Sequence, residues 1–120
     1  MNQQVHINRK GADSIEFEAS ELIIPLQGGE ETSFELSIKN HGTPTHVHLS
    51  VSEDLQNNII FLKENPYIKD EEKIPVLVRL PKGVHERTRG EIFVTTGYGA
   101  NKSSFSVDIG KAEMKEIAVI

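Results

Sequence analysis

The chain has 120 residues, a formal net charge of −5 at pH 7 and no cysteine. This length suits one domain of roughly 100–150 residues, and the missing cysteines exclude disulfides and thiolate metal sites. The acidic balance argues against nucleic acid as a partner, because proteins that bind phosphate backbones carry a basic surface.

Apolar residues recur at every second position through most of the chain. Phe34, Leu36 and Ile38 alternate with polar residues, and the segment Val47–Val51 repeats the pattern. A period of two places each apolar set on one face of a strand, whereas a helix needs spacings of three and four. The expected strands are Val5–Ile7, an extended region holding Ile15, Phe17 and Leu22–Leu26, then Thr32–Asn40, His46–Ser52, Ile59–Leu62, Ile74–Leu80, Glu91–Thr96 and Ser103–Ile109.

Residues that favour turns separate these segments. Gly28-Gly29, Asn40–Thr45, Pro81–Gly83 and Gly97–Asn101 contain the glycine, asparagine and proline residues that reverse a chain. Seven or eight short strands at this spacing predict an all-β, immunoglobulin-like sandwich of two antiparallel sheets. We expect one domain over residues 1–120, with its core at residues 15–110.

The order of these motifs resembles that of the immunoglobulin-like modules of the CARDB and NEW3 type. The similarity covers residues 20–110, and it rests on Gly29, Glu30, Phe34, Leu36, Ile38, Asn40, Gly42, Leu49, Val51, Pro81, Gly90, Ile92 and Val94. Such modules are frequent in prokaryotic, especially archaeal, cell-surface and membrane proteins. The resemblance implies a non-catalytic role in adhesion or assembly, at the cell surface.

We therefore predict a binding or structural module that is not an enzyme and holds no cofactor. No serine lies in a Gly-x-Ser-x-Gly elbow, the turn that exposes the nucleophile of many hydrolases. The expected partner is another protein or the remainder of a larger membrane-anchored assembly. A free sheet edge could accept a partner's strand or support weak self-association.

Several loop residues are candidates for binding. Tyr98 is an aromatic anchor if it is exposed, or it packs back over its hairpin. Asn101 begins an Asn-x-Ser triplet that fits N-glycosylation. Arg87 and Arg89 either form a docking patch for an acidic partner or belong to a solvated loop. The expected contact regions are the connections Asn40–Thr45, Lys82–Arg89 and Gly97–Lys102.

An alternative function is metal binding by histidines. His46 and His48 would project from the same face of one strand, with His41 shortly before them and His85 further along the chain. Two imidazoles on one face can bind a single ion, but the same residues also suit a solvated face. A carbohydrate-binding module ranks third, because the chain has no Trp and only two Tyr to stack on sugar rings.

No segment of the sequence predicts membrane insertion. No apolar stretch approaches the ~20 residues that a membrane-spanning helix needs, and no signal-peptide core follows Arg9 and Lys10. The chain as given is expected to be soluble. We expect Ile117–Ile120 to be either a last strand or the start of an anchor in a longer protein.

Overall fold

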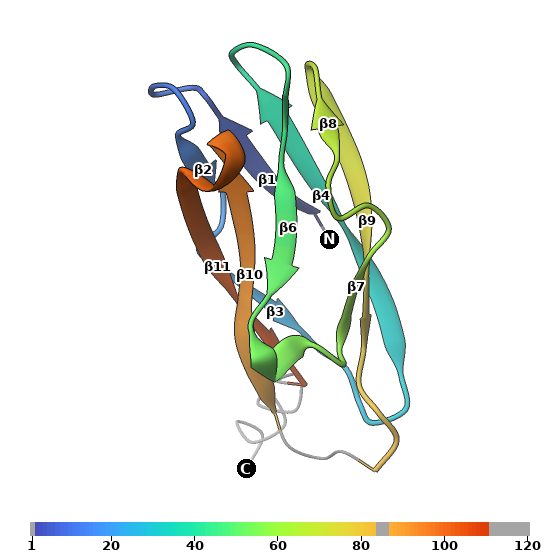
Figure 1. The fold of residues 1–120 in the computed structure, drawn as a ribbon. Helices are drawn as coiled ribbons and strands as arrows, with labels where there is room; N and C mark the ends of the chain where they lie inside the picture. The colour runs from blue at the N-terminus through green and yellow to red at the C-terminus, as the bar shows by residue number, and fades with distance from the viewer. Residues whose placement is uncertain (1, 84–86, 111–120) are drawn as a thin grey trace.

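The computed structural model describes residues 2–83 and 87–110 of the chain. These residues form eleven strands and two short 3-10 helices, which turns and loops connect (Figure 1). The strands are β1 (Asn2–Ile7), β2 (Ile15–Phe17), β3 (Glu21–Ile24), β4 (Glu31–Asn40), β5 (Thr45–His46), β6 (His48–Val51), β7 (Ile59–Phe61), β8 (Tyr67–Ile68), β9 (Glu71–Arg79), β10 (Thr88–Thr96) and β11 (Asn101–Ile109). The helices are η1 (Glu53–Leu55) and η2 (Gly97–Gly99).

Two main sheets pack face to face, which confirms the predicted all-β, immunoglobulin-like sandwich. One sheet has the order β2-β1-β4-β9-β7 and the other the order β3-β11-β10-β6, while β5 and β8 form a small separate pair. Most neighbouring strands are antiparallel, as predicted. Each main sheet is nevertheless mixed, because β1 runs parallel to β4 and β3 runs parallel to β11.

Alternate side chains of both sheets form the core between them. In β4 the buried apolar residues are Phe34, Leu36 and Ile38, and in β10 they are Ile92 and Val94. These side chains are the alternating apolar sets of the sequence, so one face of each strand is removed from water. The same cluster includes Val5, Ile7, Leu22, Ile24, Leu49, Ile74, Val76, Val78, Phe105, Val107 and Ile109.

The structure divides two of the predicted strands. The expected strand His46–Ser52 is interrupted at Val47, whose N–H donates to Pro66 O at 3.0 Å instead of pairing with β10. The expected extended region from Ile15 onward becomes β2 and β3, which lie in different sheets. Strands of two or three residues, such as β8 and β2, are too short to show a period, so sequence alone underestimates the strand number.

On the side of the sandwich where β2 and β3 are the edge strands, the segment between these two strands crosses from one sheet to the other and closes that side. Gln3 is fully buried beneath this crossing. Its Nε2 donates to Ala19 O at 2.7 Å, and its Oε1 accepts from Ala19 N at 3.1 Å. Ser106 N also donates to Ser20 O at 3.0 Å, so the crossing segment is bonded to the four-stranded sheet as well.

At the opposite side, η1 connects the two sheets and plugs one end of the core. Leu55 of η1 is fully buried. It packs where Gly90 of β10 has no side chain, since a Cβ at that position would lie 2.6 Å from Leu55 Cγ and 2.5 Å from Ser52 Oγ. Ser52 Oγ in turn accepts a hydrogen bond from Glu91 N at 3.0 Å. Glycine at position 90 is therefore what lets η1 approach the sheet.

Substituting Gly90 by alanine should destabilise the protein by overpacking this contact. We expect Gly90→Ala to lower the free energy of unfolding by about 1–3 kcal/mol, the usual cost of forcing an extra carbon into a packed core. Urea denaturation measures this loss. Gly11→Ala is the matched control, because no atom lies within 4 Å of a Cβ built there. Equal stability of the two variants would contradict this explanation of Gly90.

Two expectations from the sequence concern residues outside the described part of the chain. His85, the most distant member of the histidine set, and the terminal segment Ile117–Ile120 both lie there. Within residues 2–83 and 87–110, no helix has the length and apolar character needed to cross a bilayer.

Candidate functional site

The three histidines of the predicted metal set each contact a different neighbour. Among residues 2–83 and 87–110, no group of three or more His, Asp or Glu side chains is arranged to hold a metal ion. A hydrogen bond of 3.0 Å joins His41 Nε2 and His6 Nδ1. The ring of His46 lies beside that of Tyr67, with 4.8 Å between the ring centroids. A hydrogen bond of 2.7 Å joins His48 Nδ1 and Asn65 Oδ1.

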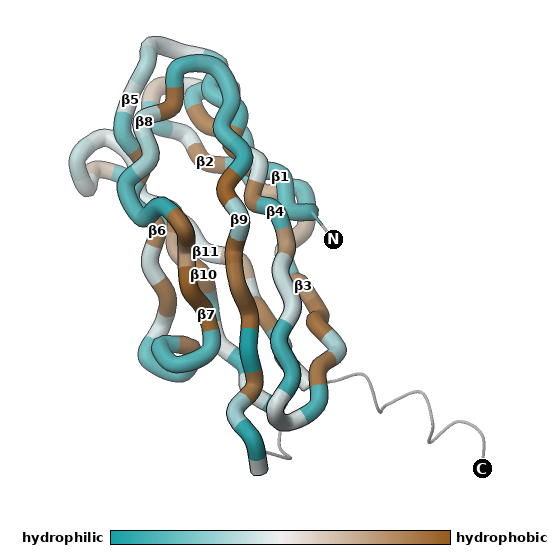
Figure 2. Tube along the Cα trace, turned by 90° about the vertical axis from the view of Figure 1, so that its right-hand side faces the viewer, coloured by the Kyte–Doolittle hydropathy of each residue, from teal (hydrophilic) through white to brown (hydrophobic). Residues whose placement is uncertain are grey.

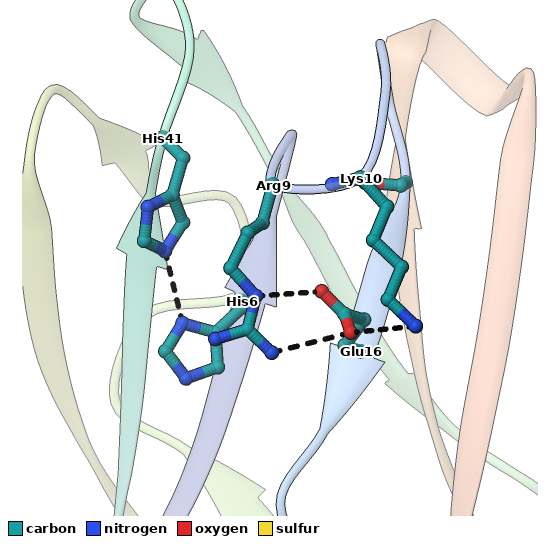
Figure 3. Close-up of polar contacts among 6 residues, drawn as sticks. His6, Arg9, Lys10, Glu16 and His41 are labelled. Carbon is teal, nitrogen blue, oxygen red and sulfur yellow. Dashed lines mark hydrogen bonds and ion pairs between the residues drawn. The ribbon is translucent and has the colours of Figure 1, made fainter.

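Glu16 lies beside the His6–His41 pair and is held by two cations (Figure 3). Arg9 Nε donates to Glu16 Oε1 at 2.9 Å, and Lys10 Nζ lies 3.4 Å from Glu16 Oε2. The hydrogen bond from Arg9 is the main reason that the pKa of Glu16 falls to about 2. Because a depressed carboxyl pKa stabilises the fold only while the group is ionised, this contribution is present above the unfolded pKa of about 4.5 and is lost as the pH falls toward 2.

His6 lies in surroundings that disfavour its protonated form. Its pKa is lowered mainly because burial removes solvent from the ring, and then because Arg9, His41 and Lys39 carry or acquire positive charge nearby. Glu16 opposes this effect, since its negative charge raises the pKa of His6. The unfolded chain therefore binds more protons at this residue than the folded one, so stability rises with pH up to about 6.5.

A direct titration tests this environment. We expect the imidazole resonances of His6 to titrate below pH 6.5 in the folded protein, as followed by NMR between pH 4 and pH 8 (roughly the range in which histidines titrate). In His41→Asn the midpoint should rise, because one positive neighbour is lost, yet it should stay below that of the unfolded chain. A His6 midpoint at or above the unfolded value would contradict the described contacts.

The structure exposes one of the predicted loop anchors and uses another within the fold. Tyr98, at the tip between β10 and β11, is 97% exposed and does not pack back over its hairpin. Its φ of 55° lies in the left-handed region. Asn101 Nδ2 donates to Asp13 O at 2.8 Å and so ties this tip to the loop before β2.

Arg87 and Arg89, the predicted docking patch, both form ion pairs within the chain. Arg87 Nε lies 3.4 Å from Asp108 Oδ1, and Arg89 Nη2 lies 3.3 Å from Glu21 Oε2. The two pairs differ in burial, because the Asp108 side chain is 1% exposed and that of Glu21 is 35% exposed. Neither carboxylate oxygen of Asp108 has a hydrogen-bond partner in the described part of the chain, so Arg87 is its described charge partner.

These two arginines should differ sharply in their effect on stability. We expect Arg87→Gln to lower the free energy of unfolding by on the order of 3 kcal/mol, because it leaves a buried carboxylate without its cation. Arg89→Gln, the matched control, should cost less than about 1 kcal/mol, as is usual for exposed pairs. Chemical denaturation of both variants makes the comparison. Equal losses would show that the burial of Asp108 does not set the strength of its pair.

The feature that sequence reasoning missed lies on the side where β6 and β7 are the edges of their sheets. Figure 1 shows these two strands as neighbours that η1 connects at one end. A groove of about 390 Å³ lies between them, lined by residues of both strands, among them Val51, Ile59, Phe61 and Glu64. No strand of the described chain lies between β6 and β7.

The backbone of β7 presents hydrogen-bonding groups to this groove. Asn58 O accepts from Arg79 N at 2.9 Å, and Leu62 N donates to Pro75 O at 3.3 Å. Bonding alternates along an antiparallel pair, so the backbone groups of Ile59 and Phe61 point away from β9. No described backbone or side-chain group pairs with their N–H groups.

The edge of β6 that faces away from β10 is already paired in part. Leu49 N donates to Glu64 O at 2.8 Å, on the side away from β10, whereas Ser52 N donates to Glu91 O on the side toward it. The N–H of Val51 therefore faces the groove, and it has no partner among the described residues. We call the groove together with the facing backbones of Val51, Ile59 and Phe61 the open seam.

An exposed apolar patch borders the open seam on the outer face of the five-stranded sheet. Ile60 is 45% exposed and pairs across the ladder with the exposed Leu77. Leu62 is also exposed, and Pro75, which accepts its N–H bond, is exposed beside it. Figure 2 shows the same apolar character along β7 and the adjoining part of β9. The sequence signal was the run Ile59–Leu62, which lacks the polar alternation of a strand with one wet face.

Comparisons with known proteins identify a family and a fold. The model of a family of unknown function (DUF7524) matches residues 4–119. No curated protein matches the chain. A structure of a family 123 glycoside hydrolase from Clostridium perfringens is similar with a TM-score of 0.63 and 16% identity, over 75% of this chain. PapD-like domain 7 of human CEP192, an ASH/PapD-like domain, is similar with a TM-score of 0.57 and 15% identity, over 78% of this chain and 82% of that domain.

These structural similarities concern the fold alone. The chain spans 22% of the length of the hydrolase chain, and both identities are too low to transfer a function. The similarity to the PapD-like domain covers most of both chains, so this chain has an immunoglobulin-like β-sandwich fold that resembles that of PapD-like domains.

Proposed function

The chain belongs to the DUF7524 family, whose function is unknown, and we propose that it is a non-catalytic module that binds another protein through the open seam. The partner would add a strand between β6 and β7. In this proposal the module catalyses no reaction and holds no cofactor.

The observation that supports the proposal most is the set of unpaired backbone groups along the seam. The N–H groups of Val51, Ile59 and Phe61 have no partner in the described part of the chain. Added strands gain affinity from main-chain hydrogen bonds of this kind and specificity from pockets for alternate side chains. The groove between Val51, Ile59 and Phe61 supplies such a pocket.

The sequence resemblance to CARDB and NEW3 modules supports a role in assembly or adhesion. Modules of that type are frequent in cell-surface and membrane proteins of prokaryotes. We therefore propose that the partner is another protein at the cell surface, or the remainder of a membrane-anchored assembly. The loop residues Tyr98, Arg87, Arg89 and Asn101 remain secondary candidates, since Tyr98 is exposed while the other three bond within the chain.

Selection of binding peptides tests the proposal even though the partner is unidentified. The purified chain selects peptides from a random library displayed on phage, and amide chemical shifts map where the enriched peptides bind. We expect the shifts to concentrate at residues 49–51 and 59–61. Val51→Pro should abolish binding, because proline removes a backbone donor that strand addition requires.

Ile23→Pro is the matched control for this variant. Ile24 O accepts from Gly110 N and Ser20 O accepts from Ser106 N, so in the parallel pair the N–H of Ile23 points away from β11 and is also an edge donor. A copy of the enriched peptide with N-methyl groups along one edge tests the same bonds in the unaltered protein, and it should not bind. Shifts that cluster around Tyr98, or equal binding by both proline variants, would overturn the proposal.

A further inference from the structure

The space for an added strand is apolar on two sides. Toward the core, the strand would lie beside Val51, Ile59 and Phe61 in the groove. Toward the outside, it would lie beside Ile60, which pairs in register with Leu77. Most sheet edges have apolar residues on the core side and polar ones on the other. Here the strand next to β7 has apolar neighbours on both of its faces.

This arrangement selects the side-chain pattern of the incoming segment. A segment of alternating apolar and polar residues would bury the groove but place polar side chains beside Ile60. A segment of consecutive apolar residues would cover both faces, as in strands that are buried on both sides. The edges are short, since β7 has 3 residues and β6 has 4. The apolar part of the partner therefore needs only about four residues, at ~3.3 Å each.

Acidic residues lie at both ends of the seam. Glu53 and Asp54 are in η1, where β6 ends, and Glu64 follows β7 and lines the groove. No ion pair of the described residues involves any of these three carboxylates. A partner strand with basic residues at its ends would complement them.

Two basic side chains near β7 have contacts elsewhere in the chain. Lys63 Nζ lies 3.7 Å from Glu72 Oε1, and Arg79 Nε donates to Asn57 O at 3.2 Å. Neither forms an ion pair with Glu53, Asp54 or Glu64. Exposed charges of this kind contribute less than about 1 kcal/mol each, and salt screens them.

We infer that the seam recognises a short extended segment of another protein, and this inference rests on the proposed function. The segment has consecutive apolar residues flanked by Lys or Arg. The apolar centre is recognised by the groove on one face and by the patch of Ile60, Leu62, Pro75 and Leu77 on the other. The basic flanks are recognised by Glu53, Asp54 and Glu64.

Three labelled synthetic peptides test this inference by fluorescence anisotropy. The first has the centre Val-Ile-Val-Val between Lys-Lys ends, the second has the same centre between Glu-Glu ends, and the third has the centre Val-Ser-Val-Ser between Lys-Lys ends. At low salt we expect the first to bind at least about tenfold more tightly than either of the others. Its affinity should fall as salt is added, because the interactions at the flanks are screened.

Variants of the protein locate the effect. Ile60→Lys should weaken binding of the first peptide about fivefold or more, the loss that follows from ~1 kcal/mol of one cross-strand apolar contact. Ile23→Lys is the matched control, because Ile23 is 44% exposed on the edge strand β3 and Ile60 is 45% exposed on the edge strand β7. The control should bind like the original protein.

The outcomes separate this inference from the proposed function. Equal binding of the alternating or Glu-flanked peptide overturns the inference, as does failure of the first peptide to bind. The proposed function stands in those cases if library-selected peptides still map to the seam and are lost in Val51→Pro. If sedimentation shows a dimer that Ile60→Lys disrupts and Ile23→Lys does not, the occupant is a second copy of the chain, which also overturns the inference.

Discussion

A backbone N–H or C=O group at a sheet edge must find a partner or face water, and this constraint explains how the two sides of the sandwich differ. On the β2–β3 side, the chain crosses between the sheets, and the buried amide of Gln3 pairs with both backbone groups of Ala19. On the β6–β7 side, η1 crosses at one end, and at the other end Glu64 O and Pro66 O accept hydrogen bonds from Leu49 N and Val47 N. The edge groups between η1 and Glu64 therefore face a groove.

Five ion pairs link charged side chains in the described part of the chain. Arg87 and Arg89 contact Asp108 and Glu21, and Arg9 and Lys10 hold Glu16. Such pairs reduce the number of free cations that could attract an acidic partner. At the seam, carboxylates without an ion pair among the described residues lie close to exposed apolar residues, and this combination is why a docking role is assigned there.

Much of the fold follows from side-chain order. Alternation in the segments around Leu36, Ile92 and Val107 predicted strands whose alternate apolar residues prove to be buried. The candidate site could be predicted less well from the sequence. Tyr98 is exposed as an anchor should be, but His41, His46 and His48 contact three separate neighbours. His6, which lies beside His41, is 35 residues away in sequence and gave no signal there.

The sequence by itself determined which residues turn inward, because a strand places alternate side chains on opposite faces regardless of its neighbours. Only the tertiary structure decided which strands became edges, since edge position depends on the order of strands in a sheet and not on their composition. It placed the run Ile59–Leu62 at such an edge, where half of its apolar side chains face outward. The open seam exists because two edges from separate sheets meet without a strand between them.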